Sequence, residues 1–126
     1  MKLSKTSLTR LATVHKDLSR LILAASGSTP IDFIVTEGMR TLERQKELVK
    51  AGASTTLRSR HLTGHAVDLA CLIDGKLSWD WPLYYRLADH IKQVAILEKV
   101  SIEWGGDWKT FKDGPHYQLP WAKYPV

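Results

Sequence analysis

Apolar residues near the start of the chain recur mostly at steps of three and four, the spacing that one face of an α-helix presents. They are Leu8, Leu11, Val14, Leu18, Leu21, Ile22 and Ala25. The pattern predicts a single amphipathic helix over residues 6–25. Ser4 or Ser7 is placed to cap its start, and Gly27 to end it.

In the next segments the residue pattern changes from that of a helix to that of a strand, and then back to that of a helix. Residues 31–36 form a β-branched run, Ile-Asp-Phe-Ile-Val-Thr, which predicts a strand. Good helix formers over residues 41–50 predict a short helix that ends before Gly52. The residues of this helix that we expect to face inward are Leu42, Leu48 and Val49. The Ser- and Thr-rich residues 53–60 then predict a loop.

A hairpin and a long helix are predicted in the second half. The apolar run over residues 66–72 predicts a buried strand, and Asp74-Gly75 is a hairpin turn that leads into a short return strand over residues 76–79. A helix is expected over residues 80–99, with Pro82 in its first turn. Its apolar stripe consists of Leu83, Leu87, Ile91, Val94, Ala95 and Leu97.

Two short strands complete the pattern, at residues 102–104 and 116–119, with a loop between them over residues 107–114. No internal repeat, low-complexity stretch or linker interrupts the sequence. We therefore expect one α+β domain over residues 1–126, in which a small antiparallel or mixed sheet packs with about three helices.

Composition and charge narrow the choice of partners. The chain has 126 residues, of which 44% are hydrophobic and 25% charged, as expected for an ordered domain with a single core. A formal charge of +5 favours anionic partners such as nucleic acid, membrane surfaces or a cell-wall polymer. The basic residues are dispersed and no nucleic-acid-reading motif is present, so we expect no nucleic-acid partner. The apolar residues 21–25 are too few for a signal peptide or a membrane span, so stable membrane anchoring is not expected.

Side chains able to bind a metal gather in two stretches. Residues 59–68 read Ser-Arg-His-Leu-Thr-Gly-His-Ala-Val-Asp, and residues 113–116 read Asp-Gly-Pro-His. Cys71 is the one cysteine, so a metal site in this chain must use histidine and carboxylate ligands. Cys71 itself lies in the apolar run over residues 66–72, and we expect it to be a small buried apolar residue.

Three of these residues suit a zinc ion. A catalytic zinc takes three protein ligands and leaves one position for water. His61 and Asp68 can converge because Gly64 permits a tight turn, and His116 would complete the set from another strand. His65 would face away from Asp68, because side chains three apart on a strand point to opposite faces. The spacing alone also allows a structural His61–Asp68 hydrogen bond with His116 as an ordinary strand residue.

Further residues could perform chemistry beside such a site. Asp113 lies three residues before His116, and its carboxylate could take a proton from water and pass it to a leaving amine. Arg40 follows the predicted strand over residues 31–36, and its guanidinium could hold a substrate carboxylate or stabilise an oxyanion. Trp104 and Trp108, which lie close to the second stretch in the sequence, are candidates to line a substrate groove.

Four separated segments of the sequence, in order and spacing, resemble the zinc D-alanyl-D-alanine carboxypeptidase-like family. That family includes the vancomycin-resistance D-Ala-D-Ala peptidases and the bacteriophage L-alanyl-D-glutamate endopeptidases, and the resemblance is closest to the latter. The segments are Glu37-Gly38-Met39-Arg40-Thr41 with Gln45, Ser59-x-His61-x-x-Gly64-x-Ala66-x-Asp68, Trp104-Gly105-Gly106-Asp107-Trp108, and Asp113-x-x-His116. Met39 stands where the family's Gly-Tyr-Arg segment has an aromatic residue.

The resemblance implies a hedgehog/D,D-peptidase-like fold with a zinc site at the sheet. It implies that the ligands of Zn²⁺ are His61, Asp68 and His116. It further implies Asp113 as the catalytic base and Arg40 as the clamp for substrate or oxyanion. With Trp104 added from its place near the second stretch, the substrate-binding candidates are Ser59, Gln45 and Trp104.

The activity implied by the resemblance is hydrolysis of the peptide stem of bacterial peptidoglycan at the L-Ala–D-Glu bond, by a phage endolysin acting in host lysis. We expect a monomer without a separate wall-binding domain, made in the host cytoplasm and reaching the periplasm and wall after a holin opens the membrane. One alternative is a D-Ala-D-Ala carboxypeptidase or dipeptidase. Another is a non-catalytic zinc domain that binds the wall, which would require neither Asp113 nor Arg40.

Overall fold

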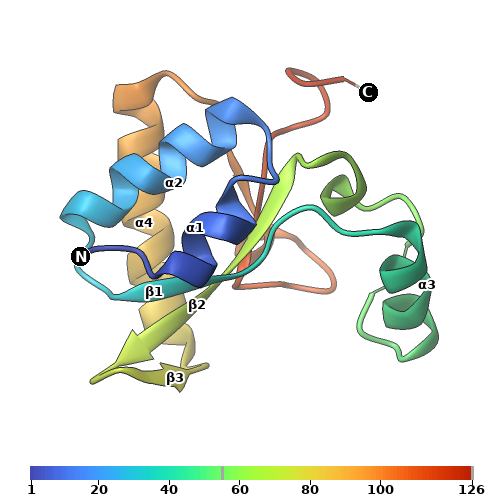
Figure 1. The fold of residues 1–126 in the computed structure, drawn as a ribbon, viewed down its shortest axis with the longest axis horizontal. Helices are drawn as coiled ribbons and strands as arrows, with labels where there is room; N and C mark the ends of the chain where they lie inside the picture. Colours follow the sequence, from blue (N-terminus) through green and yellow to red (C-terminus); the bar gives the residue numbers. More distant parts are fainter. Residues whose placement is uncertain (55, 126) are drawn as a thin grey trace.

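The computed structural model describes residues 1–54 and 56–125 (Figure 1). Thr55, in the predicted 53–60 loop, and Val126, at the end of the expected 1–126 domain, lie outside the described residues. In the described part, helices pack with a five-stranded sheet, which confirms the α+β class. The strands are β1 (Phe33–Glu37), β2 (Ala66–Ile73), β3 (Lys76–Ser78), β4 (Glu103–Trp104) and β5 (His116–Gln118).

Strand β2 is the centre of the sheet. It pairs with β1 on one side and with β5 on the other, in the order β1-β2-β5-β4, while β3 pairs with β2 through the hairpin. All of these pairs are antiparallel, so of the antiparallel and mixed sheets that were predicted the antiparallel one is found. The register places Asp68 of β2 opposite Glu37 of β1 and opposite His116 of β5.

The single helix predicted over residues 6–25 is wrong, because the segment forms two helices, α1 (Lys5–Leu11) and α2 (Lys16–Ser28). Between them, Thr13 Oγ1 accepts a hydrogen bond from Met39 N at 2.8 Å, and His15 N donates to Gly64 O at 2.7 Å. The His15 ring then caps α2 by accepting from Asp17 N at 3.0 Å. The backbone of His15 thus bonds outside the helix. Leu8 of the predicted apolar stripe is 45% exposed, but the other residues of the stripe are buried on both sides of the break.

Helix α3 (Leu42–Lys50) lies to one side of the molecule, away from the other α-helices (Figure 1). Thr41 caps its start by accepting from Arg44 N at 3.1 Å. The prediction that Leu42 faces inward is wrong, since Leu42 is 50% exposed, and Leu48 and Val49 are only half-buried. The residue that α3 buries is Gln45, because the helix packs on a polar part of the fold and not on the apolar core.

Helix α4 (Trp81–Glu98) packs against α2, and buried apolar residues of both helices share one core with β1 and β2. Pro82 lies in its first turn as predicted, and Lys99 in the left-handed conformation ends it. Leu97 was expected in the buried stripe but is 79% exposed. With the first helix divided, the described residues hold four α-helices where about three were expected. None of them has the length and apolar character needed to cross a membrane.

Two single-turn 3-10 helices complete the fold, η1 (Arg60–Thr63) and η2 (Gly105–Asp107). η1 leads into β2 through Gly64 in the left-handed conformation at φ 75°, which is the tight turn expected at this glycine. η2 follows β4 and leads into the loop before β5. η1 therefore lies at the start of β2, and η2 at the end of β4, which is separated from β2 by β5.

Candidate metal centre

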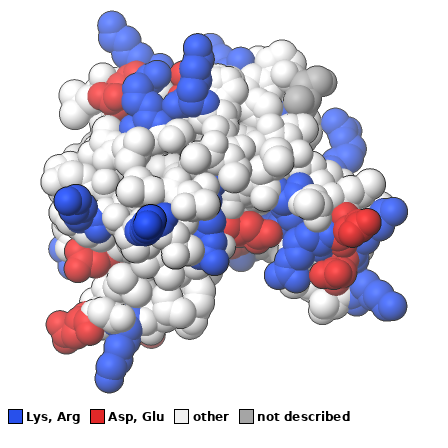
Figure 2. Space-filling model, viewed as in Figure 1, with Lys and Arg blue, Asp and Glu red and all other residues white. Residues whose placement is uncertain are grey.

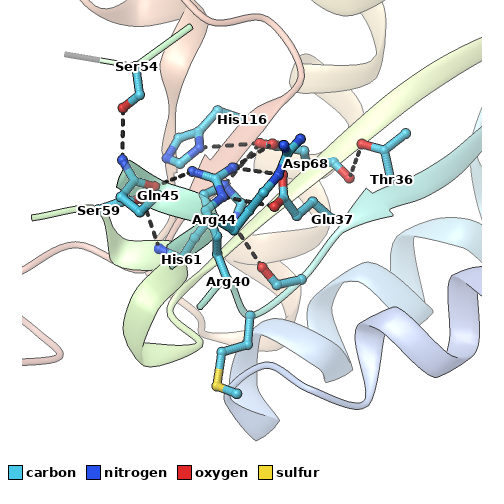
Figure 3. Close-up of polar contacts among 12 residues, drawn as sticks. Thr36, Glu37, Arg40, Arg44, Gln45, Ser54, Ser59, His61, Asp68 and His116 are labelled. Atoms are coloured by element: carbon cyan, nitrogen blue, oxygen red, sulfur yellow. Dashed lines mark hydrogen bonds and ion pairs between the residues drawn. The ribbon is translucent and has the colours of Figure 1, made fainter. Parts of the chain in front are cut away.

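The three residues predicted to bind metal come from separate elements and meet at one point (Figure 3). His61 lies in η1, Asp68 in β2, and His116 is the first residue of β5. Their potential ligand atoms all lie within 4.8 Å of one another. The antiparallel pairing of Asp68 with His116 brings two of them together, and the turn at Gly64 returns His61 to the same place.

Each of the two histidines uses its outer ring nitrogen in a hydrogen bond to an oxygen that can only accept. His61 Nδ1 lies 2.9 Å from Gly38 O, and His116 Nε2 lies 2.7 Å from Gln118 Oε1. Gln118 is itself held by donating from Nε2 to Glu103 Oε2 at 3.1 Å. These bonds place the proton of each neutral ring on the outer nitrogen, and the inner nitrogens carry lone pairs.

The inner atoms form a set suited to a cation. His61 Nε2 and His116 Nδ1 lie 3.2 and 3.3 Å from the same carboxylate oxygen, Oδ1 of Asp68. With both rings neutral, three acceptor atoms face one another, which is unfavourable unless a proton or a metal ion lies between them. Two neutral imidazoles and one carboxylate are ligands that divalent zinc takes. The residues present therefore fit a metal ion.

Burial and the interactions with neighbouring charged groups shift the pKa values of these residues in opposite directions. Burial alone would raise the pKa of Asp68, but hydrogen bonds with His116 and His61 hold its pKa well below the ordinary value. Burial likewise would lower the pKa of His116, yet the hydrogen bond with Asp68 leaves that pKa raised. Asp68 thus stays a carboxylate, and a metal ion would compete with a proton for the His116 nitrogen.

Asp113 lies in the turn that precedes β5 and faces the same cavity. Its backbone N donates to Gly105 O at 3.1 Å, and its carbonyl accepts from His116 N at 3.2 Å. A Cβ added at Gly105 would collide with the Asp113 carbonyl, so the glycine allows the turn to pack against η2. Burial, and then the charge of Asp68, raise the pKa of the Asp113 carboxyl.

Arg40 reaches the centre but is already paired with other side chains (Figure 3). Its Nε and Nη2 each donate to the Glu37 carboxylate at 2.8 Å, and its Nη1 donates to Gln45 Oε1 at 2.6 Å. Its Nη2 also lies 3.6 Å from Asp68 Oδ2. The guanidinium therefore stands beside the candidate metal ligands as a fixed charge that Glu37 largely balances.

A cavity of about 430 Å³ opens beside these residues, a volume within the usual range for small-molecule sites. Ser59, predicted to bind substrate, lines it and also caps η1 by accepting from His61 N at 3.2 Å. Trp108 lines it as well, with its ring centroid 5.0 Å from that of His116.

The structure places the other two predicted substrate-binding residues away from the cavity wall. Gln45 is buried, and its amide is fully used by Arg40, Ser54 and the carbonyl of Thr56. Trp104 is 3% exposed, and its Nε1 donates to Gly114 O at 2.7 Å. Nearness to a motif in sequence is a weak guide here, because Trp104 points from β4 into the core while the motif faces outward.

Sequence reasoning missed residues that the site uses. Gln118 could have been found, because side chains two apart on a strand share a face and Gln118 is two residues after His116. Glu37 lay in the matched segment, but nothing in its spacing indicated that it would pair with Arg40. Arg58 and Trp121 also line the cavity, from loops that no local pattern connects.

The fold and the site together define a class, the D,D-peptidase fold with a His-Asp-His centre at its sheet. The chain superposes with a TM-score of 0.54 on the vancomycin resistance D,D-dipeptidase VanXYg, at 17% identity, covering 84% of this chain and 50% of that one. This likeness concerns the fold alone.

Within that class, the chain belongs to the family described as phage L-alanyl-D-glutamate peptidase, which it matches over residues 1–118. It is 39% identical over 121 residues to the L-alanyl-D-glutamate peptidase of Listeria phage A118, covering 96% of this chain. The chain spans 42% of the length of that relative. The crystal structure of the Serratia marcescens L-Ala D-Glu endopeptidase ChiX matches with a TM-score of 0.93 and 45% identity, covering 99% of this chain and 95% of that one.

Proposed function

We propose that this chain is a zinc-dependent peptidoglycan peptidase that hydrolyses the L-Ala–D-Glu bond of the peptide stem. The observation that carries the proposal is the convergence of three acceptor atoms, from His61, Asp68 and His116, in a cavity that Asp113 also lines. The choice of the L-Ala–D-Glu bond as the scissile bond rests on the family to which the chain belongs, which is described as phage L-alanyl-D-glutamate peptidase.

His61, Asp68 and His116 are the proposed ligands of Zn²⁺. Bound there, zinc would polarise the scissile carbonyl and make a water molecule acidic enough to attack it near neutral pH. The hydrogen bonds to Gly38 O and Gln118 Oε1 would hold both rings in the required orientation.

The remaining chemistry falls to the protein's own side chains. Asp113 would take the proton of the attacking water and deliver it to the leaving amine of D-Glu, and its raised pKa suits a group that both accepts and donates. Arg40 would stabilise negative charge that develops on the carbonyl oxygen. Ser59 would contact the substrate from the cavity wall, while Gln45 would position Arg40.

In the cell, residues 1–126 would act as one peptidase domain and as a monomer. Basic side chains are scattered over the face shown in Figure 2 and do not gather in one patch, which suits loose attraction to an anionic wall. We propose synthesis in the cytoplasm of an infected bacterium, without membrane anchoring, followed by holin-dependent release to the periplasm and wall.

The test is a mass-spectrometric map of muropeptides from purified sacculi digested with the zinc-loaded protein. We expect released peptides with a new D-Glu amino terminus, and glycan strands that keep L-Ala. Protein treated with a chelator is the control and should release neither. Release of D-Ala alone would instead indicate a D-Ala-D-Ala carboxypeptidase or dipeptidase. Zinc binding without any cleavage would indicate a non-catalytic wall-binding domain.

A further inference from the structure

Three arginines line the cavity, and two of them are already bonded inside the protein. Arg40 is held by Glu37, as described above. Arg60 is 2% exposed, and its guanidinium donates to Leu119 O at 2.9 and 3.0 Å and to Tyr124 O at 2.6 Å. Neither can give its full hydrogen-bonding capacity to a ligand without breaking these bonds.

Arg58 differs from the other two. It is exposed, and among the described residues its guanidinium has no hydrogen bond to an acceptor and no carboxylate within ion-pair distance. The Arg58 guanidinium nevertheless has a defined place, because it lies over the Trp121 ring at 5.1 Å from the centroid. It is a cation that an aromatic ring positions and that keeps its donors free.

Its surroundings give this end of the cavity a positive potential. The Arg60 guanidinium lies over the same Trp121 ring at 4.2 Å, so two cations stand together at this wall. The carboxylates that line the cavity are Glu37, Asp68 and Asp113. Of these, Glu37 is paired with Arg40, and Asp68 contacts the two histidines. We therefore expect the partner of Arg58 to be an anion that enters the cavity from solvent.

The proposed function, on which this step rests, supplies such an anion. In the L-Ala–D-Glu bond the leaving amine belongs to glutamate. A glutamate joined to the next residue through one carboxyl group keeps its other carboxylate free. That carboxylate travels with the leaving group and must lie within the same cavity as the scissile bond. A guanidinium fork is well matched to a planar carboxylate.

We infer that Arg58, positioned by Trp121, binds the free carboxylate of the glutamate on the amine side of the scissile bond. Arg58 is thus a specificity-determining residue: it favours stems in which this group is a carboxylate over stems in which it is a carboxamide. The discrimination arises because a carboxamide has the same shape but lacks the charge that a guanidinium recognises.

The experiment compares two synthetic stem peptides that differ only in this group, carboxylate or carboxamide. Steady-state kinetics are measured with the zinc-loaded protein and with Arg58→Gln, Arg58→Lys and Arg86→Gln. Arg86 is an exposed arginine on α4 outside the cavity and serves as the matched control. Zinc content and melting temperature are measured for each variant to show that it is folded.

We expect the unaltered protein to prefer the carboxylate peptide. Arg58→Gln should lower kcat/KM for that peptide by about 10- to 100-fold, mainly through KM, the range of a charge-assisted hydrogen bond. Cleavage of the carboxamide peptide should stay within about twofold, Arg58→Lys should recover part of the loss, and Arg86→Gln should match the unaltered protein.

Two results would overturn the inference while leaving the proposed function intact. One is an equal loss of kcat/KM on both peptides in Arg58→Gln, which would mean that Arg58 has a structural role. The other is an unchanged preference for the carboxylate, which would place its recognition elsewhere. Failure of the unaltered, zinc-loaded protein to cut either peptide at the L-Ala–D-Glu bond would instead refute the proposed function, and the inference with it.

Discussion

His116 is oriented by a residue that the proposed metal ion would not touch. Gln118 accepts from the outer nitrogen of the His116 ring, and Glu103 holds the Gln118 amide in the one rotation that allows this. A histidine that can neither turn nor change tautomer binds a metal ion more strongly, because it loses less conformational entropy when the ion binds. The side chains behind the centre therefore matter nearly as much as those in it.

Replacing Gln118 with Leu should weaken zinc binding. The apolar side chain removes the acceptor for His116 Nε2, so we expect the Kd for zinc to rise by about 10- to 100-fold. Competition with a chromogenic chelator measures this Kd. Gln93→Leu, at an exposed glutamine of α4, is the matched control and should bind zinc as the unaltered chain does. Equal affinity in both variants would show that Gln118 does not act on the metal ligand.

Replacing Asp113 with Asn should separate catalysis from metal binding. The amide keeps the shape of the carboxylate but cannot move a proton, so kcat should fall by about 10²- to 10⁴-fold while the zinc content is unchanged. Release of stem peptides from sacculi and metal analysis provide the two readouts. Asp107→Asn, at an exposed aspartate of η2, should retain activity. Full activity in Asp113→Asn would remove Asp113 from the proposed mechanism.

The sequence predicted that His61, Asp68 and His116 come together, and the structure places their potential ligand atoms within 4.8 Å of one another. Residue type and spacing made His61, Asp68, His116 and Asp113 candidates, and the resemblance to the peptidase family implied the role of each. Gln45 was placed at the substrate by the family resemblance and Trp104 by its nearness to the second stretch, but both are buried and neither lines the cavity. Arg58 and Trp121 meet only through the tertiary fold, so no local pattern could join them.

At the scale of elements, the register of three strands sets the positions of the site residues. Asp68 is opposite both Glu37 and His116, and the register of β1 against β2 shifts between Val35 and Glu37. The chain leaves β1 there and turns at Gly38, whose carbonyl holds His61. A one-residue slip of β5 against β2 would turn Asp68 and His116 to opposite faces of the sheet, and a slip of β1 would do the same to Asp68 and Glu37.

The break between α1 and α2 shows what local periodicity cannot predict. The apolar stripe continues through residues 12–15, so a continuous helix satisfies the pattern equally well. The helix breaks because Thr13 and His15 bond to Met39 and Gly64, which come from segments much later in the chain. The break therefore depends on contacts that exist only once the chain has folded.

Replacing Gly38 with Ala should destabilise the protein through this break. A Cβ at Gly38 would collide with the Arg10 carbonyl and Thr13 Oγ1, so we expect a loss of about 1–3 kcal/mol in the free energy of unfolding. Urea denaturation measures the loss. Gly27→Ala, where a Cβ would meet nothing within 4 Å, is the control and should be neutral or slightly stabilising. Equal stability of the two variants would contradict the close packing of Gly38.

At the scale of the whole molecule, the proposed metal ion would join three segments far apart in the sequence. Removing it should therefore lower the melting temperature as well as activity, because an ion that binds only the folded chain stabilises it by mass action. At a free zinc concentration of 100 times Kd the stabilisation is about 2.7 kcal/mol.

Differential scanning calorimetry of the chelated protein, with and without added zinc, checks this expectation. The transition should move up by a few degrees with zinc, as a stabilisation of this size does in a chain of 126 residues. Magnesium, which prefers oxygen ligands, is the control and should have little effect. A transition that zinc does not move would show that no zinc ion holds the three segments together.

The position of β5 late in the chain has a consequence for synthesis. A ribosome makes His61 and Asp68 well before it reaches His116, so the nascent chain holds an incomplete ligand set for more than a third of its translation. Over the same interval residues 66–68 of β2 lack their β5 partner, and this part of the edge is open to pairing with other chains. Arrival of β5 closes that edge and completes the centre in one event, so the newly made protein could not cut its target before nearly all of its sheet has formed.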